Sequence, residues 1–214
     1  MSTLCLSLEL PAQIDAIGPS ASILRRFVGD DEALIAGVEA VAAAAPFRRM
    51  TTPGGRPISV AMTNCGALGW ISDRSGYRYS ATDPLDVAPW PAMPPGFGRV
   101  ARAAAAAAGF AGFEPDACLI NCYVPGTRLS LHQDRDEASF AAPIVSVSLG
   151  LPVTFLFGGM RRAERPQRYL LEHGDVVVWG GESRLYFHGV APLAEGIHAK
   201  LGRRRINLTF RRAT

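Results

Sequence analysis

Two histidines and one aspartate carry the clearest chemical signal in this sequence. His132 and Asp134 stand two residues apart in LSLHQDRDE, and His188 follows in RLYFHGV. Alternate side chains of a strand share a face, so we expect His132 and Asp134 to point the same way. Two imidazoles and one carboxylate form a facial set of metal ligands that leaves positions open for oxygen chemistry. Zinc could use the same set, and the spacing alone can also arise by chance.

The last strand-like segment, RINLTFR, alternates strictly between polar and apolar residues. This pattern puts Arg205, Asn207, Thr209 and Arg211 on one face of a strand. An edge strand could expose that face to water. If the face lines a cavity instead, the arginines need anions, because an unpaired buried charge is costly. A small dicarboxylate would satisfy them, since arginine can bind a carboxylate through two hydrogen bonds.

A third segment, ACLINCYV, offers a matching polar face. Asn121 and Tyr123 share one side of this predicted strand, and both can donate hydrogen bonds to carboxylate oxygens. Each residue also has an ordinary structural role open to it: Asn121 could cap a turn and Tyr123 could belong to the core. Three strands with chemically matched faces favour a common cavity.

The composition is that of a globular protein with a modest positive charge. The 214 residues are 48% hydrophobic and 19% charged, with a formal net charge of +3, and Lys200 is the single lysine among 22 basic residues. An arginine-rich chain suits phosphate recognition, but a GC-rich genome would produce the same bias. Four arginines gather in GGMRRAERPQR, at positions 161, 162, 165 and 168. They could form a solvated loop or contact DNA phosphates.

The cysteine pattern and the absence of long apolar segments favour a cytoplasmic protein. Cys5, Cys65, Cys118 and Cys122 have neither zinc-ribbon nor disulfide-framework spacing, so we expect reduced thiols. The N-terminus has no basic lead or long apolar stretch, so we expect no secretory signal. No segment approaches the roughly 20 apolar residues that span a bilayer, so we expect no membrane partner.

Two helices and many short strands should position these residues. Residues 29–47 have acidic residues at the start and a proline at the end, and residues 95–108 begin after a proline pair and stop at a glycine. Glycine and proline punctuation predicts hairpins in residues 52–80. Beyond residue 116, eight short strands are expected in ACLINCYV, RLSLHQD, IVSVSLG, VTFLFGG, RYLLE, DVVVWGG, RLYFHGV and RINLTFRR. So many strands without intervening helices indicate a sandwich or jelly roll.

These motifs together resemble the AlkB family of iron(II)- and 2-oxoglutarate-dependent dioxygenases. The resemblance rests on NCYVPGTRLSLHQDRDE, APIVSVSLGLP, LEHGDVVVWGGESRLYFHG and RINLTFR, and the upstream TPGG, MTNCGALGW and PWPAMP resemble the bacterial members. It extends from about residue 22 to the C-terminus. It implies a mainly β fold with flanking helices, in which residues 1–214 form a single domain. Residues 116–214 would be a double-stranded β-helix (jelly-roll) core, and residues 1–115 would hold the N-terminal helices and a nucleotide-recognition lid.

The resemblance also assigns roles to the metal and cofactor residues. His132, Asp134 and His188 would bind Fe(II) and form the catalytic centre. The predicted 2-oxoglutarate site contains two sets of residues, one for the distal carboxylate (Arg205, Asn207 and Tyr123) and one near the iron-chelating end (Arg211 and Asn121). Cys122 is counted with this motif, but it replaces a larger basic residue, and its parity puts it on the opposite face.

The expected substrate is an alkylated base, recognised by residues from both halves of the chain. Trp70 and His132 would sandwich the base, and Asp136 would face its exocyclic amine. Contacts to the rest of the nucleotide are expected from Tyr77, Arg78, Tyr79 and Arg162. Arg56 stands where the family commonly has an aromatic residue, which puts the details of lid contact in doubt.

The predicted reaction is oxidative demethylation of bases of the 1-methyladenine or 3-methylcytosine type. It would consume O2 and 2-oxoglutarate and release formaldehyde, succinate and CO2. The expected partner is alkylated DNA, with single strands favoured and RNA left open, and the chain is expected to act as a monomer without an obligate protein partner. Two alternatives are an iron and 2-oxoglutarate hydroxylase of a protein or small molecule, and a metal-binding jelly-roll module without catalysis.

Overall fold

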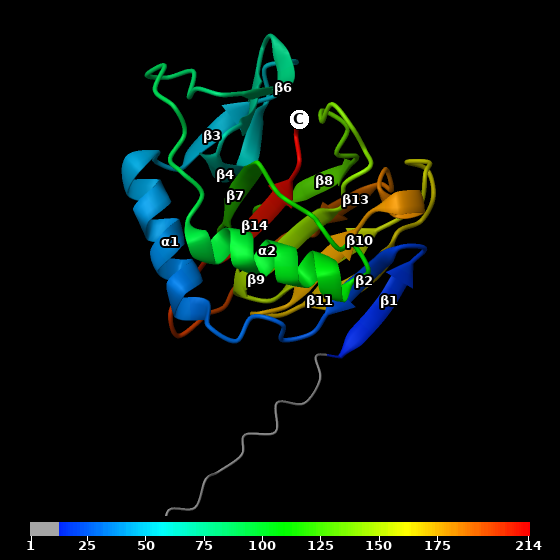
Figure 1. Ribbon diagram of the computed structural model, residues 1–214. Helices are drawn as coiled ribbons and strands as arrows, with labels where there is room; N and C mark the ends of the chain where they lie inside the picture. The colour runs from blue at the N-terminus through cyan, green and yellow to red at the C-terminus, as the bar shows by residue number, and fades with distance from the viewer. Residues whose placement is uncertain (1–12) are drawn as a thin grey trace, which may run out of the picture.

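The computed structural model describes residues 13–214 and is mainly β with two helices (Figure 1). Cys5 and the N-terminal segment in which we expected no signal sequence lie outside these residues. The N-terminal half contains strands β1 (Ile14–Gly18), β2 (Ala21–Leu24), β3 (Arg48–Thr51), β4 (Pro57–Gly66), β5 (Gly69–Asp73) and β6 (Gly76–Ser80). The C-terminal half contains β7 (Ala117–Tyr123), β8 (Leu129–His132), β9 (Ile144–Gly150), β10 (Val153–Phe157), β11 (Gln167–Leu171), β12 (Val176–Trp179), β13 (His188–Val190) and β14 (Arg205–Arg211).

Both predicted helices are present, with ends that local chemistry explains. Helix α1 (Asp31–Ala44) begins where the Asp30 side chain accepts a hydrogen bond from the amide of Ala33, and it ends just before Pro46. Helix α2 (Pro95–Ala107) carries proline at its first position and is followed by Gly109, whose φ is +90°. Neither helix of residues 13–214 has the length and apolar character needed to cross a membrane.

The eight predicted C-terminal strands correspond to β7–β14, but β8, β10, β12 and β13 are each shorter than predicted, β13 most of all. β13 is only three residues long, because Gly181–Ser183 forms a 3-10 turn and the amide of Tyr186 donates to the carbonyl of Ser183. The predicted hairpin region contains β4, β5 and β6. The strands β1, β2 and β3 were not predicted.

The strands form one large sheet, one small sheet and a separate hairpin. The large sheet has the order β1-β2-β12-β9-β14-β7-β4-β3, the small sheet has the order β11-β10-β13-β8, and β5 pairs with β6. β14 therefore lies in the middle of the large sheet, between β9 and β7. Its polar face is not on a sheet edge, which excludes the solvated edge strand considered above.

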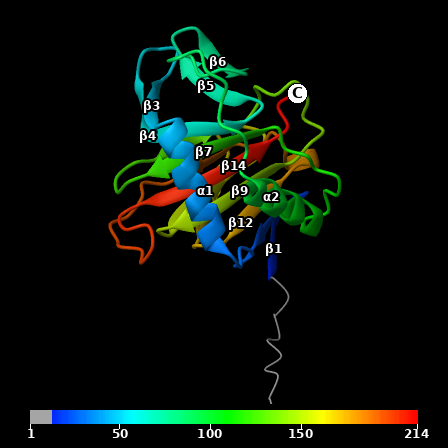
Figure 2. The same cartoon turned by 60° about the vertical axis from the view of Figure 1, so that its left-hand side comes forward.

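Two apolar clusters cover the two faces of the large sheet. Helices α1 and α2 pack on one face through residues such as Val38 and Ala101, against Ile120, Leu208 and Phe210 of the strands (Figure 2). The second cluster joins the opposite face to the small sheet, through core residues that include Ile23, Leu119, Phe155, Val177 and Trp179. The polar faces of β7 and β14 turn toward this second side.

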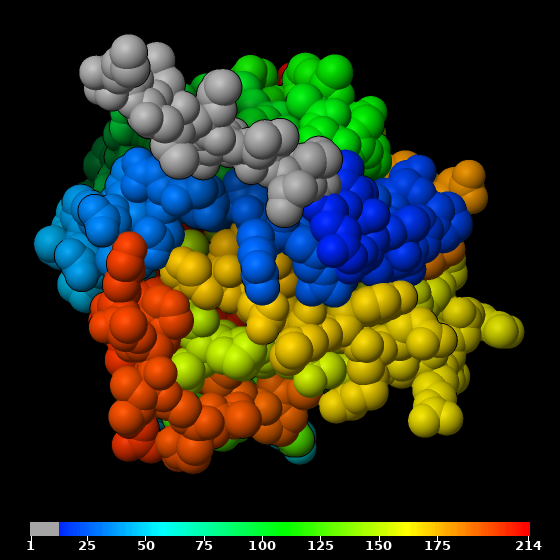
Figure 3. Space-filling model, turned by 90° about the horizontal axis from the view of Figure 1, so that it is seen from below, coloured from blue at the N-terminus to red at the C-terminus, as the bar shows by residue number. Residues whose placement is uncertain are grey.

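The N-terminal hairpin β1–β2 extends the large sheet by pairing β2 with β12, in the register Ile23 to Val177. In the view from below, this blue hairpin lies beside the yellow segment around β11 (Figure 3). Arg25 fastens the two segments, because its guanidinium donates to Asp175 at 2.8 Å and to the carbonyl of Leu170 at 2.7 Å. Asp175 is almost fully buried, so this ion pair also satisfies a buried carboxylate.

Candidate metal and cofactor site

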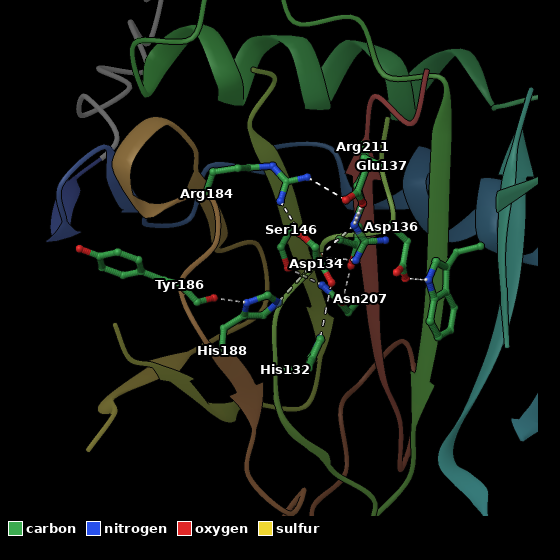
Figure 4. A network of polar contacts seen from close by, with 12 residues as sticks. His132, Asp134, Asp136, Glu137, Ser146, Arg184, Tyr186, His188, Asn207 and Arg211 are labelled. Carbon is green, nitrogen blue, oxygen red and sulfur yellow. Dashed lines mark hydrogen bonds and ion pairs between the residues drawn. The ribbon is translucent and has the colours of Figure 1, made fainter. Parts of the chain in front are cut away.

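The three predicted metal ligands converge beside the small sheet. His132 at the end of β8 lies directly opposite His188 of β13 in the strand register, and Asp134 follows two residues later (Figure 4). The Nε2 atoms of both histidines lie 3.7 Å from carboxylate oxygens of Asp134. One ligand atom from each residue lies within 4.8 Å of the others. This is the geometry of a facial metal site with other positions open.

Both imidazoles are oriented for metal binding by backbone carbonyls. His132 Nδ1 lies 2.8 Å from the carbonyl of Ser130, and His188 Nδ1 lies 3.0 Å from the carbonyl of Tyr186. A carbonyl can only accept, so Nδ1 carries the proton in each ring. The lone pair of Nε2 is then available to a cation, as in many histidine metal sites.

The charge state of the set also suits a cation. Burial lowers the pKa of His188 to about 4, and the neighbouring His132 acts in the same direction, so His188 is neutral near pH 7. Burial opposes ionisation of Asp134, but Arg211 and the two imidazoles outweigh it and hold the pKa of that carboxyl well below its usual range. The donor set therefore contains a neutral His188 imidazole and an ionised Asp134 carboxylate beside the imidazole of His132, and two imidazoles with one carboxylate fit Fe(II).

Arg211 holds the carboxylate of the set in place. Its Nε donates to Asp134 Oδ2 at 3.0 Å and also lies 3.3 Å from a carboxylate oxygen of Glu137. The side chains of Arg211 and Glu137 are almost fully buried. These carboxylates outweigh the effect of burial and raise the pKa of Arg211, which stays charged. A metal ligand held by a buried arginine has a fixed orientation.

The polar faces of β7 and β14 meet residue by residue. Tyr123 lies opposite Arg205 in the strand register, and Asn121 lies opposite Asn207. The Arg205 guanidinium carbon lies 5.0 Å from the centre of the Tyr123 ring. Asn121 donates to the side-chain oxygen of Asn207 at 3.3 Å. The structure thus brings together four residues that the sequence assigned to cofactor binding.

Arg205 is a buried cation whose hydrogen-bonding capacity is only partly satisfied by the described residues. Only 1% of the residue is exposed, and its Nε and Nη1 have no hydrogen-bond partner in residues 13–214. Its Nη2 donates to Ser148 Oγ at 3.0 Å. Burial lowers the pKa of this guanidinium, so the site is unfavourable to charge until an anion enters. One carboxylate of 2-oxoglutarate would satisfy the two free donors, so the residues fit this cosubstrate.

Three hydroxyl residues complete this surface and were not singled out as ligands from the sequence. Ser148 contacts Arg205, Ser146 Oγ accepts from Asn207 Nδ2 at 2.7 Å, and Thr209 Oγ1 donates to Asn207 Oδ1 at 2.9 Å. The two serines alternate with valine and leucine in IVSVSLG. That alternation in a central strand is the signal by which they could have been found.

A cavity of about 900 Å³ connects the metal set, Arg205 and the β5–β6 hairpin. The predicted site residues that line it are Trp70, Tyr77, Asn121, Tyr123, His132, Asp134, Asp136, Arg162, His188, Arg205, Asn207 and Arg211. Cys122, Arg78 and Tyr79 are not among the lining residues. Cys122 packs against the helix-covered core on the other face of β7, as its parity predicts.

Trp70 lies at the mouth of this cavity with an aromatic neighbour on one side. Its ring is stacked with Tyr77, at a centroid distance of 5.6 Å and an interplanar angle of 13°. The Trp70 indole N–H donates to Asp136 Oδ2 at 2.8 Å. Tyr77 thus covers one face of Trp70, and Trp70 also lines the cavity that contains His132.

The remaining predicted substrate residues have different environments. Arg78 is bound within its own hairpin by two hydrogen bonds to Asp73, at 2.9 and 2.7 Å. The Tyr79 hydroxyl donates to Glu137 at 2.7 Å and so ties the hairpin to the loop after β8. Arg162 is exposed and has no ion-pair partner in the part of the chain that is described.

Comparison with known proteins agrees with this site. Residues 20–211 match the family model of the 2OG-Fe(II) oxygenase superfamily. The chain is 58% identical to the alpha-ketoglutarate-dependent dioxygenase AlkB of Salmonella typhimurium, over 96% of this chain and 95% of that protein. It is 57% identical to the protein of the same name from Escherichia coli, over 93% of each chain.

The fold is similar to that of a solved relative. The structure of OsALKBH1 superposes with a TM-score of 0.81 at 29% identity and covers 94% of this chain and 100% of that chain. An iron-compatible ligand set, a buried guanidinium with two nitrogens unpartnered within residues 13–214, and near full-length similarity therefore agree. This chain belongs to the AlkB family of the 2OG-Fe(II) oxygenase superfamily and is an iron(II)- and 2-oxoglutarate-dependent dioxygenase.

Proposed function

We propose that this enzyme oxidatively demethylates N-alkylated bases of the 1-methyladenine or 3-methylcytosine type in DNA. The methyl group leaves as formaldehyde, and 2-oxoglutarate is converted to succinate and CO2. The observation that carries the proposal is a single cavity that contains the His132, Asp134 and His188 set at one end and the Trp70–Asp136 pair at its mouth. The AlkB names of the relatives support it.

The chain's own residues would bind and orient the reactants. His132, Asp134 and His188 would hold Fe(II), and Arg205 with Tyr123 and Asn207 would hold the distal carboxylate of 2-oxoglutarate. Bound iron supplies oxidation of the methyl group by O2 at the expense of 2-oxoglutarate. Arg211 would keep the Asp134 carboxylate ionised and oriented. Buried apolar residues around the site, such as Trp179, would exclude water.

Trp70 and Asp136 would select the base. A base methylated on its pairing edge cannot pair, so moving it out of the stack costs less than for a normal base. It would then enter the cavity between Trp70 and His132. The Asp136 carboxylate would accept a hydrogen bond from the exocyclic amine and favour the positive charge of the methylated ring.

Arginines at the cavity rim would contact the phosphates. Arg56, Arg128, Arg135 and Arg162 are exposed, line the cavity and form no ion pair within residues 13–214. A rim of free guanidiniums suits a polyanion better than a small neutral metabolite. This favours a nucleic acid, with DNA preferred and RNA left as an outcome of the test.

The proposed function also implies a domain organisation. We infer that residues 1–214 form one domain, with a double-stranded β-helix core in residues 116–214 and the helices and nucleotide-recognition lid in residues 1–115. The lid would centre on the β5–β6 hairpin, because Trp70 and Tyr77 lie there. The enzyme would act as a cytoplasmic monomer without an obligate protein partner.

One assay tests the function directly. The enzyme is incubated with Fe(II), 2-oxoglutarate, O2 and a single-stranded oligonucleotide containing 1-methyladenine, and loss of the methyl group is followed by mass spectrometry. His132→Ala, Asp134→Ala and His188→Ala should each abolish methyl loss and formaldehyde release. His198→Ala, a histidine outside the cavity, is the matched control and should retain activity.

The outcomes of this assay distinguish base demethylation from hydroxylation of another kind of substrate. Succinate formation without loss of the methyl group from DNA or RNA would point to hydroxylation of a protein or small molecule. Full formaldehyde release from any of the three ligand variants would contradict the metal assignment.

A further inference from the structure

The loop between β8 and β9, residues 133–143, has no regular secondary structure, yet it carries two functional carboxylates. Asp134 belongs to the metal set, and Asp136 lies at the mouth of the cavity. Only Arg135 separates them, but Arg211 also holds the Asp134 carboxylate, so loosening of this loop would displace Asp136 more than Asp134. An irregular loop can hold side chains precisely only if other groups fix its backbone.

A single buried side chain contacts this loop at four places. Arg184, which is only 3% exposed, donates from Nη1 to the carbonyl of Asp134 at 2.8 Å and from Nε to the carbonyl of Ala142 at 3.1 Å. Its Nη2 lies 3.0 Å from Glu137 Oε2, and its guanidinium carbon lies 5.3 Å from the centre of the Phe140 ring. The contacts run from the first part of the loop to its last part.

Arg184 itself is held by the segment that contains His188. It follows the 3-10 turn Gly181–Ser183 and donates its amide to the carbonyl of Gly181. A second hydrogen bond links the loop to the segment that contains His188, because the Gln133 side chain donates to the carbonyl of Leu185 at 2.6 Å. Figure 4 shows Arg184 reaching toward Glu137 and Asp134 from the side opposite Asp136. The loop and the His188 segment are therefore linked by side chains from both partners.

We propose that Arg184 is the positioning residue that sets the shape of the 133–143 loop and thereby aims Asp136 at the substrate. Two of its guanidinium nitrogens donate to separate backbone carbonyls and the third forms an ion pair with Glu137, so its planar geometry determines how far apart these three partners lie. Glu137 neutralises the charge, and it also accepts from Tyr79. Arg184 lies outside the cavity lining. It therefore acts on the substrate only through the loop.

The test compares Arg184→Lys with the wild-type enzyme. Lysine keeps the positive charge beside Glu137, but one ammonium group cannot serve three diverging acceptors, so the fold should persist while the loop loosens. Arg102→Lys is the matched control, because Arg102 forms an exposed pair with Glu114 outside the cavity. The charge-neutral pair Glu137→Gln with Arg184→Gln serves as a second variant if Arg184→Lys does not fold.

Two readouts report on the role of Arg184. Amide hydrogen exchange in residues 133–143 should rise in Arg184→Lys and stay unchanged in Arg102→Lys. The KM for a 3-methylcytosine oligonucleotide should rise about tenfold, a loss like that of one good hydrogen bond, while the KM for 2-oxoglutarate changes by less than about twofold. Discrimination against 3-methylthymine, which lacks the amine, should fall because Asp136 is no longer aimed.

A double-mutant cycle with Asp136→Asn separates positioning from general stability. In the Asp136→Asn background, Arg184→Lys should raise the oligonucleotide KM little further, because both changes remove the same interaction. The proposal would be overturned if the increases in oligonucleotide KM caused by the two substitutions multiplied in the double variant. Equal losses in 2-oxoglutarate turnover and demethylation would also overturn it. Amide hydrogen exchange in residues 133–143 of Arg184→Lys at the wild-type rate would overturn it as well.

The inference about substrate rests on the proposed function, and the exchange measurement separates the two. A wild-type enzyme that leaves methylated bases intact would refute the function, while loop exchange in Arg184→Lys would still decide whether Arg184 holds the loop.

Discussion

The indole N–H of Trp70 donates a 2.8 Å hydrogen bond to Asp136 Oδ2, and this bond joins the β5–β6 hairpin to the loop after β8. Trp70 offers a flat apolar face and Asp136 offers a carboxylate. The two residues come from different halves of the chain. The bond leaves the second oxygen of Asp136 available for a base amine. In the proposed function, stacking of the base on Trp70 and its hydrogen bond to Asp136 would thus be coupled.

Trp70 can be tested with two substitutions that separate these roles. Trp70→Ala removes the stacking surface, which is worth about 1–3 kcal/mol per base, so the KM for a methylated oligonucleotide should rise about 5- to 150-fold. Trp70→Phe keeps an aromatic face but loses the N–H, so it should raise KM less and weaken discrimination between bases more. Turnover of 2-oxoglutarate without DNA should be spared in both. An unchanged KM in Trp70→Ala would favour a protein or small-molecule substrate.

Arg205 should show opposite effects on stability and on cosubstrate binding. Arg205→Met removes a buried charge that lacks an anion, so without 2-oxoglutarate this variant should be as stable as the wild type or more so. Its KM for 2-oxoglutarate should rise by about 100-fold or more, since a buried charged hydrogen-bond pair is worth about 3–5 kcal/mol.

Thermal unfolding checks this prediction. Saturating 2-oxoglutarate with a divalent metal should raise the Tm of the wild type, because a ligand that binds only the folded state stabilises it. The Tm of Arg205→Met should not respond. A marked loss of Tm in this variant without ligands would show that Arg205 has partners of another kind.

The stability of the metal-free protein should fall between about pH 6.5 and 4 because of His188. The folded pKa of His188 is lowered to about 4 from 6.5, so in this window the unfolded chain binds a proton that the folded chain does not. Stability is therefore complete above pH 6.5 and decreases as the pH falls, by on the order of 3 kcal/mol in total at about 1.4 kcal/mol per pKa unit.

Urea unfolding of the chelator-treated protein at several pH values measures this dependence. His188→Gln cannot titrate, so its stability should vary less over the same range. Equal pH dependence in His188→Gln and the wild type would assign the effect to other groups.

The rim arginines should make DNA binding strongly dependent on salt. Each phosphate contact in a single strand contributes about −0.7 to the slope of log K against log salt concentration. Arg56→Ala and Arg162→Ala should each reduce the slope by about that amount and weaken binding to all sequences alike. Arg74→Ala is the control, because Arg74 is exposed at the β5–β6 turn but does not line the cavity. Fluorescence anisotropy with a labelled oligonucleotide gives the slopes, and equal slopes in all variants would remove these arginines from the interface.

The amino-acid pattern alone predicts which side chains of the site share a face. Alternation of polar and apolar residues predicts which side chains of β7 and β14 share a face, because side chains of any strand alternate. The same rule placed Cys122 on the opposite side from Asn121 and Tyr123, and HQD placed His132 and Asp134 together. These conclusions need only the local geometry of a strand.

Local patterns do not predict which of these faces meet or which residues hold them together. The pairing of Tyr123 with Arg205 and of His132 with His188 depends on strand neighbours that are far apart in the sequence. The short strands β1 and β2 exist because β12 pairs with β2, and strand preference depends strongly on such neighbours. No sequence pattern distinguishes Arg184 from the other arginines, because its four contacts with the 133–143 loop form only when the chain folds. Long-range packing, which no local pattern encodes, turned these separate faces into one cavity.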